Sequence, residues 1–386
     1  MIKAQQTQRP FTPDWISPPG DTIADLLEEL DWTQLELAER LNFSTKHISQ
    51  LVHGKVTITS DTAVKLSQVL GGSVQFWLNR EANYQAELAR LKHEQQLKQW
   101  APWLDQLPVK FLQQLGILRS GRITDKIKPY LVQESLKFFG CASPEVWATR
   151  YQRHNLDANF RQSASGQSEK QLGTIATWLR LGEIAARHRT AKSFDREKFK
   201  QAIKECRTLT QSPESEIQRL VKKLCNEAGV TFIFIPAITG ARVSGVARWL
   251  NAHTPLIQVS LHGKTNDKFW FTFFHEAAHI LFHGKDKIFV DNNEDGTQDL
   301  GVSSHEEQEA DRWARNILIP EQYADQLIGL KSRAAVEAFA KKIGVHPGIV
   351  VGRLQYEKIL PMTHLNHLKI SYEFESDFPS SEYSSS

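Results

Sequence analysis

The sequence has few cysteines and almost no net charge. Its 386 residues include 3 cysteines, Cys141, Cys206 and Cys225, an odd number without metal-binding or CxxC spacing. A disulfide framework is therefore disfavoured, and buried thiols in a reducing cytosol are expected. The formal net charge of +3 does not by itself indicate nucleic-acid binding.

Long apolar runs are also missing. Hydrophobic residues make up 40% of the chain and charged residues 24%, which is ordinary for a soluble globular protein. The most apolar stretch, near residues 269–282, is interrupted by His and Glu and is too short to span a bilayer. Residues 1–18 are polar and proline-rich, unlike a signal peptide. We therefore expect a cytoplasmic protein of two or three domains with no membrane partner.

The stretch from Phe271 to Gly284 contains the pattern His275-Glu276-Ala-Ala-His279. On a helix of about 17–20 residues, positions i and i+4 share a face, so both histidines can bind one zinc ion (Zn²⁺). Glu276 follows the first ligand and can reach a zinc-bound water without binding the metal. The pattern predicts metal-assisted hydrolysis, most often of a peptide bond. The alternative is an amphipathic core helix with incidental histidines.

Residues 306–320 predict a second helix, which offers a third ligand. Its apolar face consists of Ala310, Trp313, Ala314, Ile317 and Leu318. Glu307 falls on that face, and a buried carboxylate needs an opposite charge such as zinc. Glu307 is therefore the predicted third ligand, and Glu309, nearly opposite, is the alternative. Asp311 lies one turn after Glu307 and is expected to accept the second ring N–H of a ligating histidine.

One more histidine extends the same series. His283 follows His279 by four residues, but it lies about 12 Å along the helix axis from His275. That distance is too long for one shared ion.

Residues 33–41 and 44–51 predict a helix-turn-helix, with Thr33 and Ser44 as N-caps. The expected inward residues are Leu35, Ala38, Leu41, Ile48 and Leu51. The N-terminal end of the second helix normally enters the major groove, and a glutamine near the start of the first helix is placed to donate to a phosphate. The predicted DNA-binding residues are Gln34, Ser44, Thr45, Lys46, His47, Ser49 and Gln50. The surface is only weakly basic, so a helical domain that mediates other contacts is the alternative.

Residues 18–95 resemble the XRE-type regulators, and especially the HigA-type antitoxins. The resemblance rests on Pro19-Gly-Asp-Thr-Ile23, Gly54-Lys-Val-Thr-Ile-Thr59 and the segment from Leu70 to Asn79. It implies binding to double-stranded operator DNA, often as a homodimer, and a possible toxin partner.

Residues 212–320 resemble the ImmA/IrrE metallopeptidases, which are gluzincin-like. The resemblance rests on Gly240–Gly245, Phe269–His279, Glu307–Asp311 and Ile317–Pro320. It implies a zinc endopeptidase that, in family members, cleaves a partner repressor. The family's site residues match His275, Glu276, His279 and Glu307.

The local pattern of this region also predicts an α+β arrangement. Three strands are expected, near residues 230–235, 243–250 and 256–261, before the two metal-bearing helices. An edge strand near Ser244–Trp249 is a hypothetical site for an extended substrate.

The sequence thus predicts a multidomain, mainly α protein with a small α+β gluzincin-like domain and an N-terminal all-α domain. The expected parts are a helix-turn-helix domain at 1–95, a helical linker or sensor at 96–211, a metallopeptidase domain at 212–330, C-terminal helices at 331–365 and a disordered acidic tail at 366–386.

The expected function is a DNA-binding transcription regulator whose zinc endopeptidase cleaves a partner repressor or antitoxin, or itself at the polar loop 161–170. The alternative is an antitoxin-type repressor whose zinc domain senses or binds a partner without proteolysis.

Overall fold

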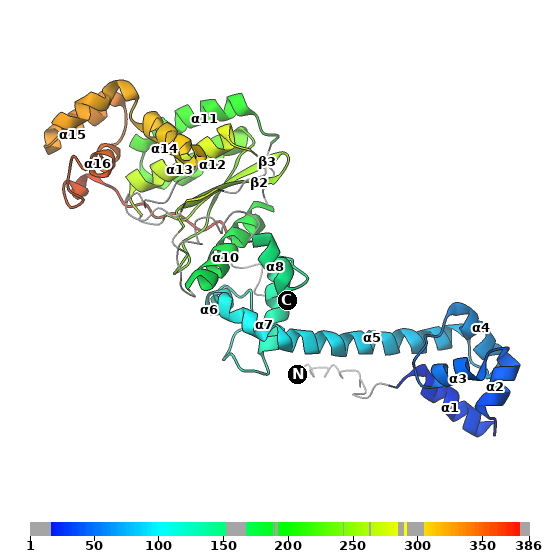
Figure 1. Ribbon diagram of the computed structural model, residues 1–386. Coiled ribbons are helices and arrows are strands. Elements are labelled where there is room, and N and C mark those ends of the chain that lie inside the picture. The colour runs from blue at the N-terminus through cyan, green and yellow to red at the C-terminus, as the bar shows by residue number, and fades with distance from the viewer. Residues whose placement is uncertain are drawn as a thin grey trace, which may run out of the picture. The chain divides into compact units, whose positions relative to one another are not determined.

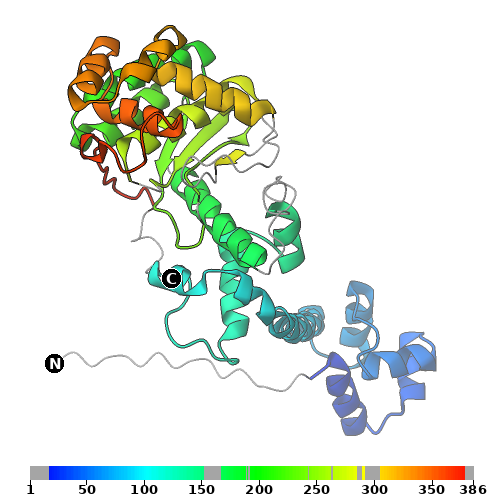
Figure 2. The same ribbon diagram turned by 60° about the vertical axis from the view of Figure 1, so that its left-hand side comes forward.

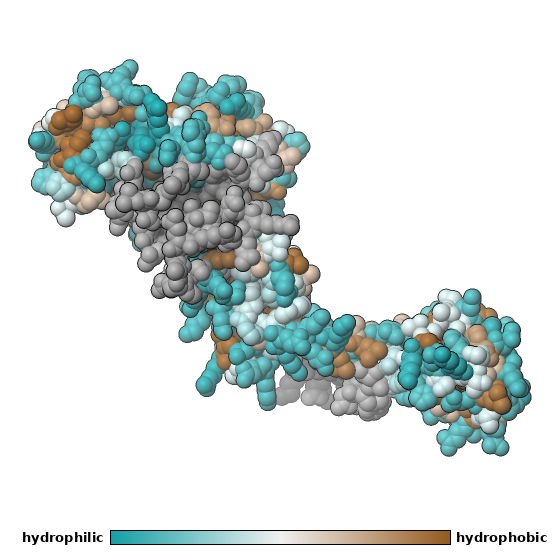
Figure 3. All heavy atoms as spheres, viewed as in Figure 1, coloured by the Kyte–Doolittle hydropathy of each residue, from teal (hydrophilic) through white to brown (hydrophobic). Residues whose placement is uncertain are grey.

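The computed structural model describes residues 17–151, 167–187, 189, 192–241, 243–261, 264–284, 289–291 and 305–378. The chain divides into two compact units, residues 1–99 and 100–386 (Figure 1). Among the described helices, none is both long and apolar enough to cross a membrane. The visible surface is mostly hydrophilic, with separate hydrophobic patches (Figure 3).

The described part of the first unit is all-α. Its helices are α1 (Pro19–Glu29), α2 (Gln34–Leu41), α3 (Thr45–Val52), α4 (Ser60–Val69) and α5 (Val74–Gln99). The hydroxyl of Thr33 accepts from the Glu36 amide and that of Ser44 from the His47 amide, as predicted for the N-caps of α2 and α3. Both helices of the predicted helix-turn-helix are therefore confirmed.

The inward face of α2 differs from the expectation at one position. Leu37, Ala38 and Leu41 are buried, whereas Leu35 is 56% exposed. A rotation of about 100° per residue places Leu35 about 200° from Leu37, and therefore away from the core. The prediction for Leu35 was wrong, while those for Ala38, Leu41, Ile48 and Leu51 are confirmed.

The second unit contains a small sheet with the strand order β1-β3-β2-β4 among the described residues. The strands are β1 (Thr231–Phe234), β2 (Gly245–Asn251), β3 (Thr254–Val259) and β4 (Phe289–Asp291). β1 runs parallel to β3, and β2 is antiparallel to both β3 and β4. The first three strands lie close to their predicted ranges.

β4 lies beside β2 on the side away from β3, where the sequence predicts no strand. Gly245, Val246 and Ala247 pair with Asp291, Val290 and Phe289. The expectation of a free edge near Ser244–Trp249 was wrong over residues 245–247, because those backbone groups already have a neighbouring strand on each side. A substrate strand therefore has no free edge there.

Helices cover both faces of the sheet (Figures 1 and 2). On one face lie α11 (Arg196–Thr208), α12 (Glu214–Glu227), α13 (Asn266–Phe282) and α14 (His305–Leu318). Their core includes Phe232, Ala247 and Ile257 from the strands and Phe269, Trp270 and Phe273 from α13. The same core extends to η4 (Glu321–Gly329), α15 (Arg333–Ile343) and α16 (Pro347–Tyr356).

The other face is covered by α10 (Gln167–Arg187). The indole N–H of Trp178 donates to the Ile235 carbonyl, and Glu183 accepts from Arg248 on β2 at 3.0 Å. Before α10 come η1 (Ala101–Gln106), α6 (Val109–Gln114), α7 (Lys128–Phe139) and α8 (Pro144–Tyr151). Part of the expected linker or sensor region therefore packs directly on the sheet.

The structure differs from two further predictions, those of a disordered tail at 366–386 and of a polar loop at 161–170. Residues 366–378 are packed rather than disordered: they include η5 (Asn366–Leu368), Tyr372 is 2% exposed, and the Asp377 amide donates to the Phe234 carbonyl. Aromatic side chains at alternate positions give this acidic segment enough apolar surface to pack. Residues 379–386 lie outside the described part. Of the expected loop 161–170, residues 167–170 belong to α10 and the others also lie outside the described part.

Candidate functional site

Helix α13 carries the His-Glu-x-x-His pattern in an almost wholly buried setting. His275 is 2% exposed, Glu276 0% and His279 2%. The surrounding turns are apolar, with Phe273, Phe274, Ala277 and Ala278 all buried. The helix therefore holds its polar side chains in a low-dielectric environment, where they need compensating partners.

Helix α14 brings a carboxylate to the two histidines. The Glu307 Oε2 atom lies 3.1 Å from the His275 Nε2 atom and 3.6 Å from the His279 Nε2 atom. The two Nε2 atoms are 3.0 Å apart. Among the described residues, His275, His279 and Glu307 form a group whose ligand atoms could hold one metal ion.

These distances fit a zinc site. With bonds of about 2.0–2.1 Å in a tetrahedron, neighbouring ligand atoms lie about 3.3–3.4 Å apart. The observed separations of 3.0, 3.1 and 3.6 Å surround that value, so small side-chain adjustments would admit the ion. The three ligands found among the described residues would leave one tetrahedral position for water or substrate, which is typical of catalytic zinc.

Asp311 lies on the other side of the first histidine. The His275 Nδ1 atom is 2.9 Å from the Asp311 Oδ1 atom. Because an ionised carboxylate only accepts hydrogen bonds, the ring donates through Nδ1, and the Nε2 lone pair is left for the metal. This contact fixes both the tautomer and the orientation of the ring.

The second histidine has a longer chain of partners. The His279 Nδ1 atom is 2.7 Å from the His283 Nδ1 atom, and the His283 Nε2 atom is 3.2 Å from the Glu309 Oε2 atom. If His283 donates to Glu309 through Nε2, its Nδ1 atom can accept from His279. Glu309 thus contacts His283 and is not part of the group formed by His275, His279 and Glu307. The sequence signal for the His279–His283 contact is their i, i+4 spacing.

Burial and hydrogen bonding determine the protonation states of His279 and Glu307. Desolvation lowers the pKa of His279 to about 4. Desolvation acts to raise the pKa of Glu307, but the hydrogen bonds and charges of His275 and His279 outweigh it and hold that pKa well below its ordinary value. A neutral imidazole and an ionised carboxylate are the forms that bind zinc.

Gly245 explains how the sheet can approach Glu276 so closely. A Cβ atom at Gly245 would lie 2.6 Å from the Thr272 Cγ2 atom and 2.7 Å from the Glu276 Oε1 atom. Any larger residue would displace the Glu276 carboxylate or the helix. Gly245 was part of the family resemblance, and this contact supplies its physical reason.

The first unit presents its predicted DNA-binding residues on α2 and α3. Ser44, Thr45 and Lys46 are exposed, and the remaining four are partly exposed, namely Gln34, His47, Ser49 and Gln50. The Arg40 guanidinium is held by Glu36 at 2.7 Å and lies over the Trp32 ring. Arg40 is thus engaged within the domain, whereas Lys46 is exposed in the first turn of α3.

Comparisons with known proteins find a match in each of the two units. A helix-turn-helix family model matches residues 23–77. The HTH-type transcriptional regulator YddM of Escherichia coli K12 is 36% identical over 81 residues, which cover 19% of this chain and 86% of that protein. The chain belongs to the XRE-type helix-turn-helix regulators. The regulator YbaQ of the same organism is 35% identical over 79 residues, which cover 20% of this chain and 65% of YbaQ.

A third relative of this regulator is the virulence-associated protein I of Dichelobacter nodosus, 32% identical over 72 residues, which cover 18% of this chain and 67% of that protein. A separate family model, the IrrE N-terminal-like domain, matches residues 225–355. That range contains His275, Glu276, His279 and Glu307. The regulator therefore joins an XRE-type domain to a peptidase-type domain of the ImmA/IrrE family.

Proposed function

We propose that this regulator carries a zinc-dependent endopeptidase that cleaves a partner repressor or antitoxin, or the regulator itself. The observation that carries the proposal is the group of His275, His279 and Glu307, whose ligand atoms have the spacing of a three-ligand zinc site. Glu276 lies beside it on the same helix, wholly buried.

Each residue has a role that follows from its position. His275, His279 and Glu307 would hold the ion, which when bound supplies Lewis-acid polarisation of the scissile carbonyl and acidifies a water. Glu276 takes the proton of the attacking water and passes it to the leaving amine.

Neighbouring residues orient the side chains of the proposed site. Asp311 orients His275, and His283 orients His279. Gly245 leaves the space that the Glu276 carboxylate occupies.

The second candidate function is an antitoxin-type repressor whose zinc domain senses or binds a partner without cutting it. A zinc ion that served only the structure would be expected to have four protein ligands and would not need a carboxylate beside it. The group, which has three ligands in the described part of the chain, and the neighbouring Glu276 therefore favour the enzyme.

The N-terminal domain is the part of the regulator that would bind DNA. We propose that α3 enters the major groove of an operator through Ser44, Thr45, Lys46, His47, Ser49 and Gln50, while Gln34 donates to a phosphate. Operators read in this way usually have two half-sites, so a homodimer is the expected binding form, and a toxin is a possible further partner.

The test is incubation of the purified full chain, with zinc or with chelator, beside the repressor or toxin encoded next to it. Intact mass spectrometry reads every product. We expect a zinc-dependent cut, and a loss of rate on the order of 10²–10⁴-fold in Glu276→Gln with zinc content unchanged. No cut of either protein, with operator binding retained, would favour the sensor function.

A mixing experiment separates cutting in cis from cutting in trans. A tagged Glu276→Gln chain is combined with the untagged wild type. Cleavage of the tagged chain at a rate that rises with wild-type concentration indicates cutting in trans. An intact tagged chain beside a processed wild type indicates cutting in cis.

A further inference from the structure

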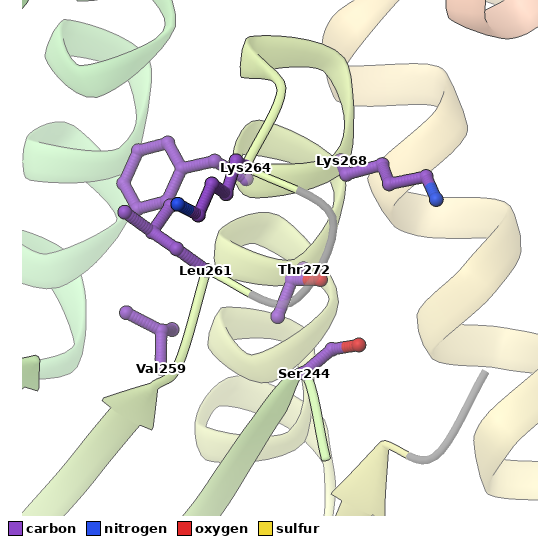
Figure 4. A pocket seen from close by; sticks show the side chains of 7 residues that line it. Ser244, Val259, Leu261, Lys264, Lys268 and Thr272 are labelled. Carbon is purple, nitrogen blue, oxygen red and sulfur yellow. The ribbon is translucent and has the colours of Figure 1, made fainter. Parts of the chain in front are cut away.

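The surface of α13 one turn before Glu276 has little room for a ligand. A small pocket there is lined by residues that include Ser244, Leu261 and Thr272 (Figure 4). Its volume of about 10 Å³ corresponds to about one water molecule, so a substrate side chain does not fit. The polar side chains that support the proposed zinc site extend instead along α14.

Helix α14 carries three polar side chains at intervals of about one turn. Glu307, Asp311 and Arg315 are spaced at i, i+4 and i+8, which places them along one side of the helix. Their side chains are 30%, 27% and 23% exposed, so most of each is shielded from solvent. Glu307 belongs to the proposed metal group and Asp311 contacts His275, so this row leads from the metal group to Arg315.

The two carboxylate oxygens of Asp311 face different partners. Its Oδ1 atom lies 2.9 Å from the His275 Nδ1 atom, and its Oδ2 atom lies 3.9 Å from the Arg315 Nη1 atom. A carboxylate that is held at one oxygen can still rotate, whereas an attraction at the second oxygen opposes that rotation. Arg315 therefore favours the orientation in which Asp311 accepts from His275.

A side chain from α16 holds Arg315 in turn. The Arg315 Nη1 atom donates to the Tyr356 hydroxyl at 2.7 Å, and the guanidinium carbon lies 5.3 Å from the centre of the Tyr356 ring. Tyr356 is the last residue of α16, which buries Val350 and Leu354 in the same core as α13. This contact restricts the rotamers of a long side chain that would otherwise move freely.

Arg315 has a second position-dependent property, which gives the alternative role. It lies in the last turn of α14, where the helix dipole favours a positive charge with or without a metal nearby. A role in helix stability alone predicts that its removal makes the domain easier to unfold. It does not predict an effect on zinc affinity that requires Asp311.

We propose that Arg315 is a positioning residue of the zinc site, that it acts through Asp311, and that Tyr356 holds it in place. This inference rests on zinc binding in the proposed function. It extends the support of His275 from α14 to α16, a helix within the range 331–365 that the sequence sets apart as C-terminal helices.

A double-mutant cycle on the zinc affinity of the purified full chain tests the proposal, with a chromogenic chelator as competitor. Arg315→Gln should weaken zinc binding about twofold to fivefold, the range of a partly exposed ion pair. In an Asp311→Ala background the same substitution should have no effect, because the residue that transmits it is absent. Tyr356→Phe should cause a smaller loss, which should disappear in the Arg315→Gln background.

The matched control is Arg333→Gln, which breaks an exposed i, i+4 pair with Glu337 and should leave zinc affinity unchanged. Urea denaturation of the zinc-free variants measures stability separately. If Arg315→Gln does not fold, Tyr356→Phe, which removes one hydroxyl, provides the same test in the Asp311→Ala background.

The outcomes separate this inference from the proposed function. An equal loss with and without Asp311, or unchanged affinity, would overturn the positioning role. Tighter zinc binding in Arg315→Gln would overturn it too, because it would show that the guanidinium charge mainly repels the ion. Zinc binding without any cleavage, with the cycle as expected, would overturn the peptidase but support Arg315. A wild type that binds no zinc would overturn both.

Discussion

The two helices that carry the proposed functions, α13 and α3, differ in how much of their surface is buried. α13 is buried on nearly all its residues, and its polar side chains are held by one another and by α14. α3 buries only Ile48 and Leu51, and its first turn is exposed. A catalytic group needs a dry, fixed environment, whereas a recognition helix must offer its side chains to a partner. Substitutions on α13 should therefore affect stability and chemistry, and those on α3 should affect binding.

The largest expected effect is on stability, from Phe273→Ala on α13. Phe273 is wholly buried between α13 and the sheet and contacts the Phe232 ring. Its removal leaves a cavity and should lower the free energy of unfolding of the second unit by about 3–5 kcal/mol. Urea denaturation measures this effect, with the 40% exposed Phe282→Ala as the matched control. A loss no larger than that of the control would show that the buried face of α13 does not stabilise the second unit as argued.

A smaller effect is expected from the partners of His275 and His279, the proposed metal-binding histidines. Asp311→Asn changes the acceptor of His275, and Glu309→Gln changes the acceptor of His283. Zinc affinity should fall by about 10–100-fold in the first and by less in the second, because Glu309 acts through an additional histidine. Competition with a chromogenic chelator gives both values. Glu321→Gln, which changes an exposed pair with Arg312, is the control. Unchanged affinity in Asp311→Asn would remove the proposed orienting role.

The smallest effect on stability should come from Lys46→Ala at the start of α3. The side chain is exposed, so the free energy of unfolding should change by less than about 0.5 kcal/mol. Operator binding should weaken similarly for all sequences, and the salt slope should fall by about 1, if Lys46 contacts a phosphate. Fluorescence anisotropy across a salt series measures both. Lys92→Ala, an exposed lysine on α5, is the control. A change confined to particular operator bases would instead assign Lys46 to base recognition.

The sequence predicted the parts of this fold that repeat with a regular period. The helix-turn-helix, the three longer strands and helices α13 and α14 follow from caps, alternation and helical spacing. Glu307 was chosen over Glu309 from the apolar face of its helix, and the structure brings Glu307 to the histidines. A helical face can be computed from spacing alone, which is why this choice was possible.

The remaining features depend on contacts between distant segments. The described part of β4 has only three residues, so its pairing with β2 has no strong local signal. The Glu309–His283 contact joins two helices, and nothing in either helix alone specifies it. The acidic composition of the C-terminal segment predicted disorder, but Tyr372 and Phe374 pack against Phe269. Leu35 was misplaced because a short helix offers too few turns to fix its phase.

The most direct test of the central claim is anomalous diffraction at the zinc edge from crystals of the zinc-loaded protein. The account predicts one ion about 2.0–2.2 Å from the His275 Nε2, His279 Nε2 and Glu307 Oε2 atoms, with Glu276 outside the coordination sphere. An ion bound through Glu309 or His283, or an ion coordinated by Glu276 itself, would contradict the assignment of ligands and base.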